Sequence, residues 1–234
     1  MRMPTTVWVL KDYDDSLKNF QKEHNLTIFH LMGQHVNYKQ RYRTKQARFW
    51  ASSYEDKRPE LTNAQRKMLS HYDNATLYND SIVAQIVKRF QKQDAIVIYV
   101  PDHGEECYEE TRGFICRNHS AEIDWPLAHY EFEIPFWIYC SPKYIRNHRD
   151  IYRQIRKAKD KRFMTDALPH LLLYLAGIET PTYKEEYNIL SSKYDEMRPR
   201  ILKNSADYDK LRDAHLEKIK KEESKKVKKK ERRN

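Results

Sequence analysis

Glycine, cysteine and long apolar runs are scarce in this chain, and each scarcity argues against a class of protein. Four glycines in 234 residues are too few for a glycine-rich phosphate loop to be the central feature. Three cysteines without a Cys-x-x-Cys pair argue against a zinc ribbon and a thioredoxin-type site. No apolar run approaches the roughly 20 residues that cross a bilayer, and the apolar stretch near the N-terminus is too short for a signal peptide.

The residues that are present favour a folded chain with a basic end. Hydrophobic residues make up 39% and aromatic residues 12%, enough for a packed core, which excludes wholesale disorder. The net charge is +10, but residues 217–234 hold ten Lys or Arg and four Glu and account for +6 of it. A nucleic-acid or anionic-lipid partner would bind this basic segment, although a solvated helix end is the commoner explanation for such a run of charges. The segment lacks the interleaved aromatic residues that stacking on single strands needs, so we expect no nucleic-acid partner.

Short apolar runs alternate with helical patterns along the chain. Residues 26–29, 95–100 and 134–139 predict strands buried on both faces, and therefore a sheet between helices. Between the first two strands, Val83, Ile86, Val87 and Phe90 share one helix face. After the third strand, apolar residues from Met164 to Leu175 predict a second helix, with Gly177 as its C-cap. This alternation predicts an α/β domain.

The three cysteines leave the redox state open. Cys107 and Cys116 could pair as a disulfide, which would leave Cys140 as a free, buried thiol in the third strand.

Asp102 and His103 carry the sharpest chemical signal, because they directly follow the second predicted strand. In open α/β sheets, ligands bind at the carboxyl ends of strands. A carboxylate and an imidazole there can share one divalent metal, and such a mixed pair suits Zn²⁺. Gly104 allows a tight turn beneath the metal, and Glu105 can support the ligands. Alone, the tripeptide is short, and a turn with a surface histidine is the commoner explanation.

Further histidines lie near the strand ends. His30 and His35 follow the first predicted strand on either side of Gly33, and His119 lies sixteen residues beyond His103. Protonated histidines can hold a phosphate or a departing oxygen, although a histidine pair at this spacing is more often structural. His71 falls in a helical context.

The order of these motifs resembles the phosphoethanolamine transferases, which are sulfatase-like enzymes of the alkaline phosphatase superfamily. The resemblance covers roughly residues 10 to 200 and is specific, because five motifs recur in order. The matching residues are His30-Leu-Met-Gly-Gln-His35 with Tyr38, Arg41 and Tyr42; Tyr72-Asp73-Asn74 with Tyr78 and Asp80; Asp102-His103-Gly104-Glu105-Glu106; Ile134-Pro135-Phe136; and Asp166 with Leu175-Ala176-Gly177-Ile178.

The resemblance implies a sulfatase-like, mostly parallel sheet flanked by helices, formed by residues 1–200. Beyond about residue 200 the apolar pattern thins, so we expect a charged helical or disordered tail over residues 201–234. It implies Zn²⁺ as cofactor, with Mn²⁺ and Mg²⁺ as alternatives. Asp102 and His103 match two metal ligands, and the phosphoryl group is surrounded by His30, His35 and His119. The implied reaction moves phosphoethanolamine from phosphatidylethanolamine to lipid A or lipopolysaccharide core, at the periplasmic face of the inner membrane.

Some features depart from the family pattern. Gln34 stands where Ser is usual, and Arg43 where Pro is usual. The family's nucleophilic threonine and an acidic ligand precede the first histidine motif, and no threonine here has that context. We therefore expect a domain incomplete on its N-terminal side, a catalytic residue missing from this chain, and no transfer by the chain alone. The alternatives are a non-catalytic metal- or phosphate-binding remnant and another hydrolase of the sulfatase family.

Overall fold

The computed structural model of the chain describes residues 7–16, 24–109, 113, 115–118 and 121–231. The chain divides into two compact units. The first holds Met1–Ala95 and Cys107–Cys116, and the second holds Ile96–Glu106 and Arg117–Asn234. Among the described residues, no helix combines the length and the apolar character that crossing a membrane requires.

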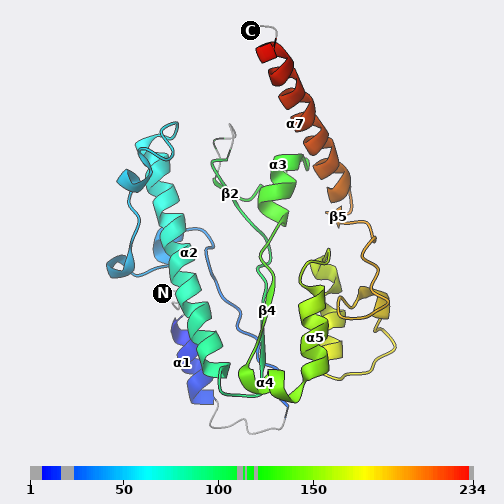
Figure 1. Cartoon of the computed structure of the whole chain (residues 1–234). Coiled ribbons are helices and arrows are strands. Elements are labelled where there is room, and N and C mark those ends of the chain that lie inside the picture. Colours follow the sequence, from blue (N-terminus) through cyan, green and yellow to red (C-terminus); the bar gives the residue numbers. More distant parts are fainter. Residues whose placement is uncertain (1–6, 17–23, 110–112, 114, 119–120, 232–234) are drawn as a thin grey trace. The chain divides into compact units, whose positions relative to one another are not determined.

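The first unit is built on one long helix, α2 (Asn63–Phe90) (Figure 1). Thr62 and Gln65 begin it with a reciprocal capping box, which satisfies backbone groups that a helix start leaves open. Near its end, Ile82, Val83 and Ile86 are buried on one face, so the helix predicted from the apolar spacing is confirmed.

Short elements surround α2 within the first unit. The ring of Tyr13, from α1, packs against Phe29 and Phe90, and Arg89 donates to both oxygens of Asp14 at 2.8 and 2.7 Å. A separate core cluster contains Tyr54, Leu61, Leu69, Cys107 and Tyr108. The elements besides α2 are α1 (Val7–Ser16), η2 (Tyr38–Gln40), η3 (Thr44–Gln46), η4 (Ala51–Tyr54), β2 (Glu106–Cys107), which begins in the second unit, and β3 (Ile115–Cys116).

The strand predicted over residues 26–29 is wrong. The segment joins no β-ladder among the described residues, and Leu26 and Ile28 are 78% and 80% exposed. An apolar run of this kind favours an extended, buried backbone. It forms a β-strand only where a neighbouring strand is available to pair with it.

The second unit contains a two-stranded sheet of β1 (Ile96–Tyr99) and β4 (Trp137–Cys140), which confirms the second and third predicted strands. The strands run antiparallel, with Ile96 opposite Cys140. The α/β class is confirmed, whereas this pair corrects the expectation of a mostly parallel arrangement. Pro135 lies in the part of the third run that stays outside β4, because proline has no N–H to donate to a ladder. Cys140 is buried, and all three cysteines are free thiols, so Cys107 and Cys116 are not paired.

A helical layer follows β4. The predicted second helix is present as α6, but it begins at Leu168 rather than Met164, because η6 precedes it. Gly177 ends it at φ +65°, and its N–H donates to the Tyr174 carbonyl at 3.1 Å, which confirms the predicted C-cap. The elements are α4 (Pro142–Asn147), α5 (Arg149–Ala158), η6 (Thr165–Ala167), α6 (Leu168–Leu175) and η7 (Glu185–Tyr187).

The last helix of the second unit docks through its N-terminal turns. The Trp125 ring stacks between His129 and His215, at centroid distances of 5.4 and 5.1 Å. Asp209 bonds to Arg162 and accepts from Arg200 at 2.6 Å, and these arginines hold the pKa of its carboxyl below its usual range. The elements here are α3 (Trp125–Leu127), the π-helical turn η5 (Ala128–Phe132), β5 (Ile201–Leu202), β6 (Ala206–Asp207) and α7 (Tyr208–Glu231).

Replacing Asp209 by Asn should destabilise the protein by about 1–3 kcal/mol at pH 7, because two partly buried guanidinium groups lose their counter-charge. Since the folded pKa of Asp209 is lowered, this stabilisation is present above its unfolded pKa near 4 and is lost as pH falls further. Urea unfolding at pH 7 and at pH 3 measures both effects. Asp213→Asn is the matched control: that carboxylate is 62% exposed, and its loss should cost less than about 0.5 kcal/mol. Equal losses in the two variants would refute the role of Asp209.

Candidate active site

Asp102 and His103 lie just beyond β1, as the sequence predicted. The His103 backbone N–H donates to Asp102 Oδ1 at 3.1 Å, and the ring Nε2 lies 3.7 Å from Asp102 Oδ2. The other ring nitrogen, Nδ1, lies 2.6 Å from the Gly104 carbonyl oxygen. Because a carbonyl only accepts, Nδ1 carries the proton, and Nε2 presents its lone pair on the side of the Asp102 carboxylate. The Asp102 side chain is 87% exposed.

This arrangement suits two ligands of one cation. A metal-binding histidine commonly donates its second ring N–H to a carbonyl or carboxylate, as Nδ1 of His103 does. No group of three or more His, Cys, Asp or Glu side chains among the described residues is placed to hold a metal ion. Asp102 and His103 therefore fit half of a four-coordinate zinc shell.

Gly104 fixes the loop that carries these two residues. Its N–H donates to the Glu131 carbonyl at 2.8 Å, and a Cβ added at Gly104 would lie 2.2 Å from the Tyr130 carbonyl oxygen. Real Cβ atoms do not approach backbone oxygens so closely, so glycine is required here for close packing against η5. The sequence predicted a glycine that permits a tight turn, and the structure shows that the close approach of η5 requires this glycine.

Glu131 is a residue that sequence reasoning missed. It is 5% exposed, its backbone carbonyl holds Gly104, and its Oε1 accepts from the Asn118 backbone N–H at 2.5 Å. One residue thus joins the Asp102–His103 loop to the segment that leads into His119, which lies outside the described residues. The π-helical turn that carries Glu131 is a form enriched at functional sites. No sequence signal identifies Glu131, because an acidic residue between aromatic residues is equally expected at the protein surface.

His30 and His35 lie in an exposed loop of the first unit. Gly33, at φ +46°, allows the turn between them, and the His35 N–H donates to the Met32 carbonyl at 3.0 Å. Arg41, a residue of the same sequence motif, holds the loop by donating to the His35 and Val36 carbonyls at 2.5 and 2.7 Å. The motif therefore contains its own backbone support.

Gln34 joins this histidine loop to α2. Its Nε2 donates to Thr76 Oγ1 at 3.1 Å, so the residue that departs from the family pattern has a structural contact. His30 and His35 belong to the first unit and Asp102 and His103 to the second; that the two sets meet at one site stays a prediction.

Other motif residues have structural partners. The Tyr42 hydroxyl lies 2.9 Å from Nδ1 of His71, and burial, with Lys39 and Lys67 nearby, lowers the pKa of His71. Arg198 donates to both oxygens of Asp166 at 2.5 and 2.7 Å. Tyr42 and Asp166, which belong to the matching motifs, therefore support the fold through these contacts.

Comparisons with known proteins place these features in a family. Residues 6–178 match the family described as Sulfatase. Among curated proteins, the chain is 33% identical over 195 residues to phosphoethanolamine transferase EptC of Escherichia coli O18:K1:H7, covering 80% of this chain and 31% of that protein. It is 31% identical over 141 residues to Kdo(2)-lipid A phosphoethanolamine 7''-transferase of Escherichia coli K12, covering 59% of this chain and 23% of that protein.

Solved structures agree with the sequence comparisons. The C-terminal periplasmic domain of EptC from Escherichia coli, in complex with Zn, superposes with a TM-score of 0.72 at 28% identity, covering 90% of this chain and 58% of that chain. The corresponding Campylobacter jejuni domain, at 21% identity and a TM-score of 0.64, shares the fold. The chain spans about a third of the length of the EptC proteins that it matches. With the Sulfatase match covering most of its length, this chain belongs to the sulfatase family.

Proposed function

We propose that this chain supplies part of the catalytic domain of a phosphoethanolamine transferase. The observation that carries the proposal is the Asp102–His103 pair at the end of β1, with Nε2 of His103 turned toward the carboxylate, in a chain whose curated relatives are named phosphoethanolamine transferases. The donor is phosphatidylethanolamine, and the acceptor is lipid A or lipopolysaccharide core. The reaction takes place at the periplasmic face of the inner membrane.

Asp102 and His103 would hold Zn²⁺ through a carboxylate oxygen and Nε2. A bound Zn²⁺ would lower the pKa of the attacking nucleophile and neutralise the negative charge of the phosphoryl group. His30, His35 and His119 surround the phosphoryl group and donate protons or hydrogen bonds to its oxygens. Gly104 and Glu131 hold the metal-binding loop in place through the η5 turn. In this proposal, residues 1–200 form the sulfatase-like portion and residues 201–234 the charged tail.

A chimera tests the proposal. In it, this chain replaces the segment of Escherichia coli EptC that it matches, so the remaining residues of the site come from the relative. With phosphatidylethanolamine and lipid A, we expect the chimera to release diacylglycerol and to modify lipid A. A zinc chelator should remove both activities, and added Zn²⁺ should restore them, because half of the predicted shell comes from this chain.

Three results would count against the proposal. A chimera that folds but releases no diacylglycerol would favour a non-catalytic remnant. Free phosphoethanolamine without modified lipid A would favour a hydrolase. Turnover that persists in chelator would contradict the metal assignment.

A further inference from the structure

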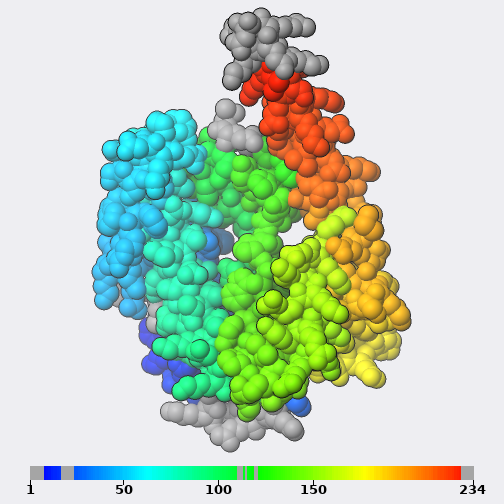
Figure 2. Space-filling model, in the orientation of Figure 1, coloured from blue at the N-terminus to red at the C-terminus, as the bar shows by residue number. Residues whose placement is uncertain are grey.

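Helices α4 and α5 form a strongly basic surface on the second unit, called here the α4–α5 surface (residues 142–160). It contains seven Lys or Arg and two Asp, a net charge of +5, which is half of the net charge of the whole chain. All nine of these side chains are exposed, and Figure 2 shows the segment, coloured green to yellow-green, uncovered in this view. The basic residues are Lys143, Arg146, Arg149, Arg153, Arg156, Lys157 and Lys159.

The arginines of α5 lie along one face of that helix. Spacings of four and three positions place Arg149, Arg153 and Arg156 next to one another. The opposite face is apolar and packs into a core cluster of the second unit, through Ile151, Ile155 and Ala158. Because the core covers the apolar face, the face of α5 that a partner can reach is charged.

Most of the positive charges on this surface have no acidic neighbour. Arg153 pairs with Asp150 at 2.9 Å, and Lys159 pairs with Asp160 at 3.4 Å. The other five cations form no ion pair with any residue that the structure describes. A surface with this excess of positive charge attracts a partner that carries several negative charges.

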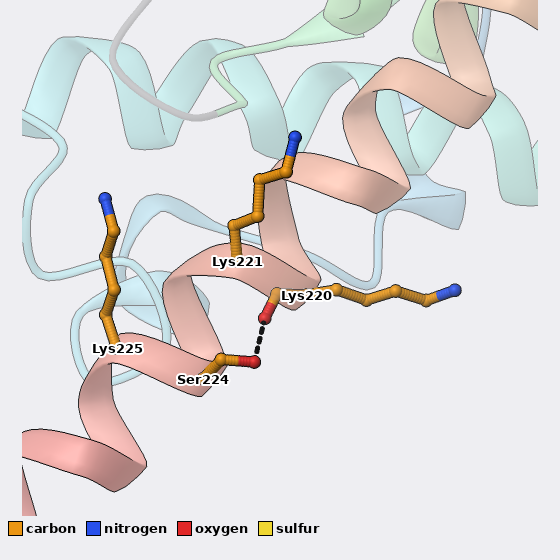
Figure 3. Close-up of a pocket in the computed structure, with 4 residues that line it drawn as sticks. All are labelled: Lys220, Lys221, Ser224 and Lys225. Atoms are coloured by element: carbon orange, nitrogen blue, oxygen red, sulfur yellow. Dashed lines mark hydrogen bonds between the residues drawn. The ribbon is translucent and has the colours of Figure 1, made fainter.

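Helix α7 carries the other run of lysines, but its charge is more nearly balanced. Lys220, Lys221 and Lys225 line a shallow pocket with Ser224 (Figure 3). Over residues 216–227, however, three glutamates accompany five lysines, which leaves a net charge of only +2. The α4–α5 surface therefore attracts an anionic partner more strongly than α7 does.

The shape and composition of the α4–α5 surface favour an extended anionic partner. An outward-facing helix cannot enclose a small anion, whereas lipid phosphates lie in a plane that several arginines reach at once. A guanidinium group binds phosphate oxygens in pairs, so arginine suits phosphate better than lysine does. No exposed residue of this surface is aromatic, so it lacks the stacking groups of single-strand nucleic-acid binders.

We propose that the α4–α5 surface binds an anionic phospholipid bilayer, with Arg149, Arg153 and Arg156 contacting lipid phosphates. Clusters of about four to eight Lys or Arg on an amphipathic helix are typical of proteins that bind anionic lipids. This interaction goes beyond the proposed catalytic function and does not depend on it, because it uses neither the metal ligands nor the histidines of the loop in the first unit.

Vesicle co-sedimentation of the 234-residue chain tests the proposal. Vesicles of phosphatidylcholine with phosphatidylglycerol should bind the chain, vesicles of phosphatidylcholine alone should not, and added salt should weaken the binding. Arg149→Gln, Arg156→Gln and Lys157→Gln together should weaken binding about 100-fold, because each cation near an anionic membrane surface strengthens binding roughly five-fold.

Two controls show whether the position of the charges matters. Lys220→Gln, Lys221→Gln and Lys225→Gln remove the same charge from α7 and should change binding less than about three-fold. Arg149→Lys with Arg156→Lys keeps the charge of the α4–α5 surface and should bind within about five-fold of the parent. Circular dichroism should show unchanged helix content in all variants, because Gln and Lys are both good helix formers.

Four results would overturn the proposal. The first is a parent chain that does not bind the anionic vesicles. The second is an equal loss in the α4–α5 and α7 glutamine variants, because overall charge would then explain the binding. The third is a lysine variant that binds as weakly as the α4–α5 glutamine variant. The fourth is tighter binding to a double-stranded oligonucleotide than to the anionic vesicles at the same salt, which would favour nucleic acid.

Discussion

Alanine at His103 is expected to lower diacylglycerol release by the EptC chimera at least about 1,000-fold. The imidazole is one of the two metal ligands that we propose for this chain, and site residues that act as a unit lose most of their effect when one is removed. Since His103 is proposed to hold the metal that activates the nucleophile, kcat should fall while the KM for phosphatidylethanolamine changes little. Initial rates over a range of donor concentrations separate these two parameters.

Asp102→Asn separates a metal-binding role from a structural one. The amide keeps the size of the side chain but loses its charge, so zinc affinity should fall and excess Zn²⁺ should restore part of the activity. His24→Ala is the matched control for His103→Ala, because His24 is exposed and lies outside every matching motif. If the His103 variant stayed folded and active within about ten-fold of the parent, the ligand assignment would be wrong.

Alanine at Gly104 is expected to destabilise the protein by about 2–4 kcal/mol and to abolish transfer by the chimera. The added methyl group would lie 2.2 Å from the Tyr130 carbonyl oxygen. Because both groups belong to backbone-fixed positions, no rotamer relieves the clash. The loop must instead move away from η5, break the Gly104–Glu131 hydrogen bond and displace Asp102 and His103.

Gly177→Ala provides the comparison for this prediction. Gly177 has a positive φ, but nothing lies within 4 Å of an added Cβ, so alanine there should cost about 1 kcal/mol through backbone strain alone. Thermal unfolding of both variants measures the difference. A Gly104 variant no less stable than the Gly177 variant would show that the loop tolerates displacement from η5.

Sequence reasoning succeeded where local rules decide the outcome. The apolar spacing around Val83 and the glycine at position 177 predicted a helix face and a helix end, because both depend on residues within a few positions of each other. The location of Asp102 and His103 beyond a strand was predicted for the same reason: the apolar run of β1 ends just before them. The family resemblance then gave these residues a chemical meaning.

Long-range pairing could not be predicted in the same way. A continuous apolar run has no direction, so β1 and β4 were expected in a mostly parallel sheet, although they pair antiparallel. Leu26 and Ile28 satisfy the pattern of a buried strand without the neighbour that would bury them. The role of Glu131 depends on Gly104 and Asn118, which lie 27 and 13 positions away, so only the folded chain shows it.

The pairing of β1 with β4 also has a kinetic consequence. Its innermost partners, Tyr99 and Trp137, lie 38 positions apart, so closing the intervening loop costs about 3 kcal/mol of chain entropy before the ladder contributes. Contacts within α2, in contrast, form between near neighbours and need no such closure. Asp102 and His103 lie inside this loop, so during refolding we expect the helical signal to recover before the proposed metal-binding pair acquires its geometry.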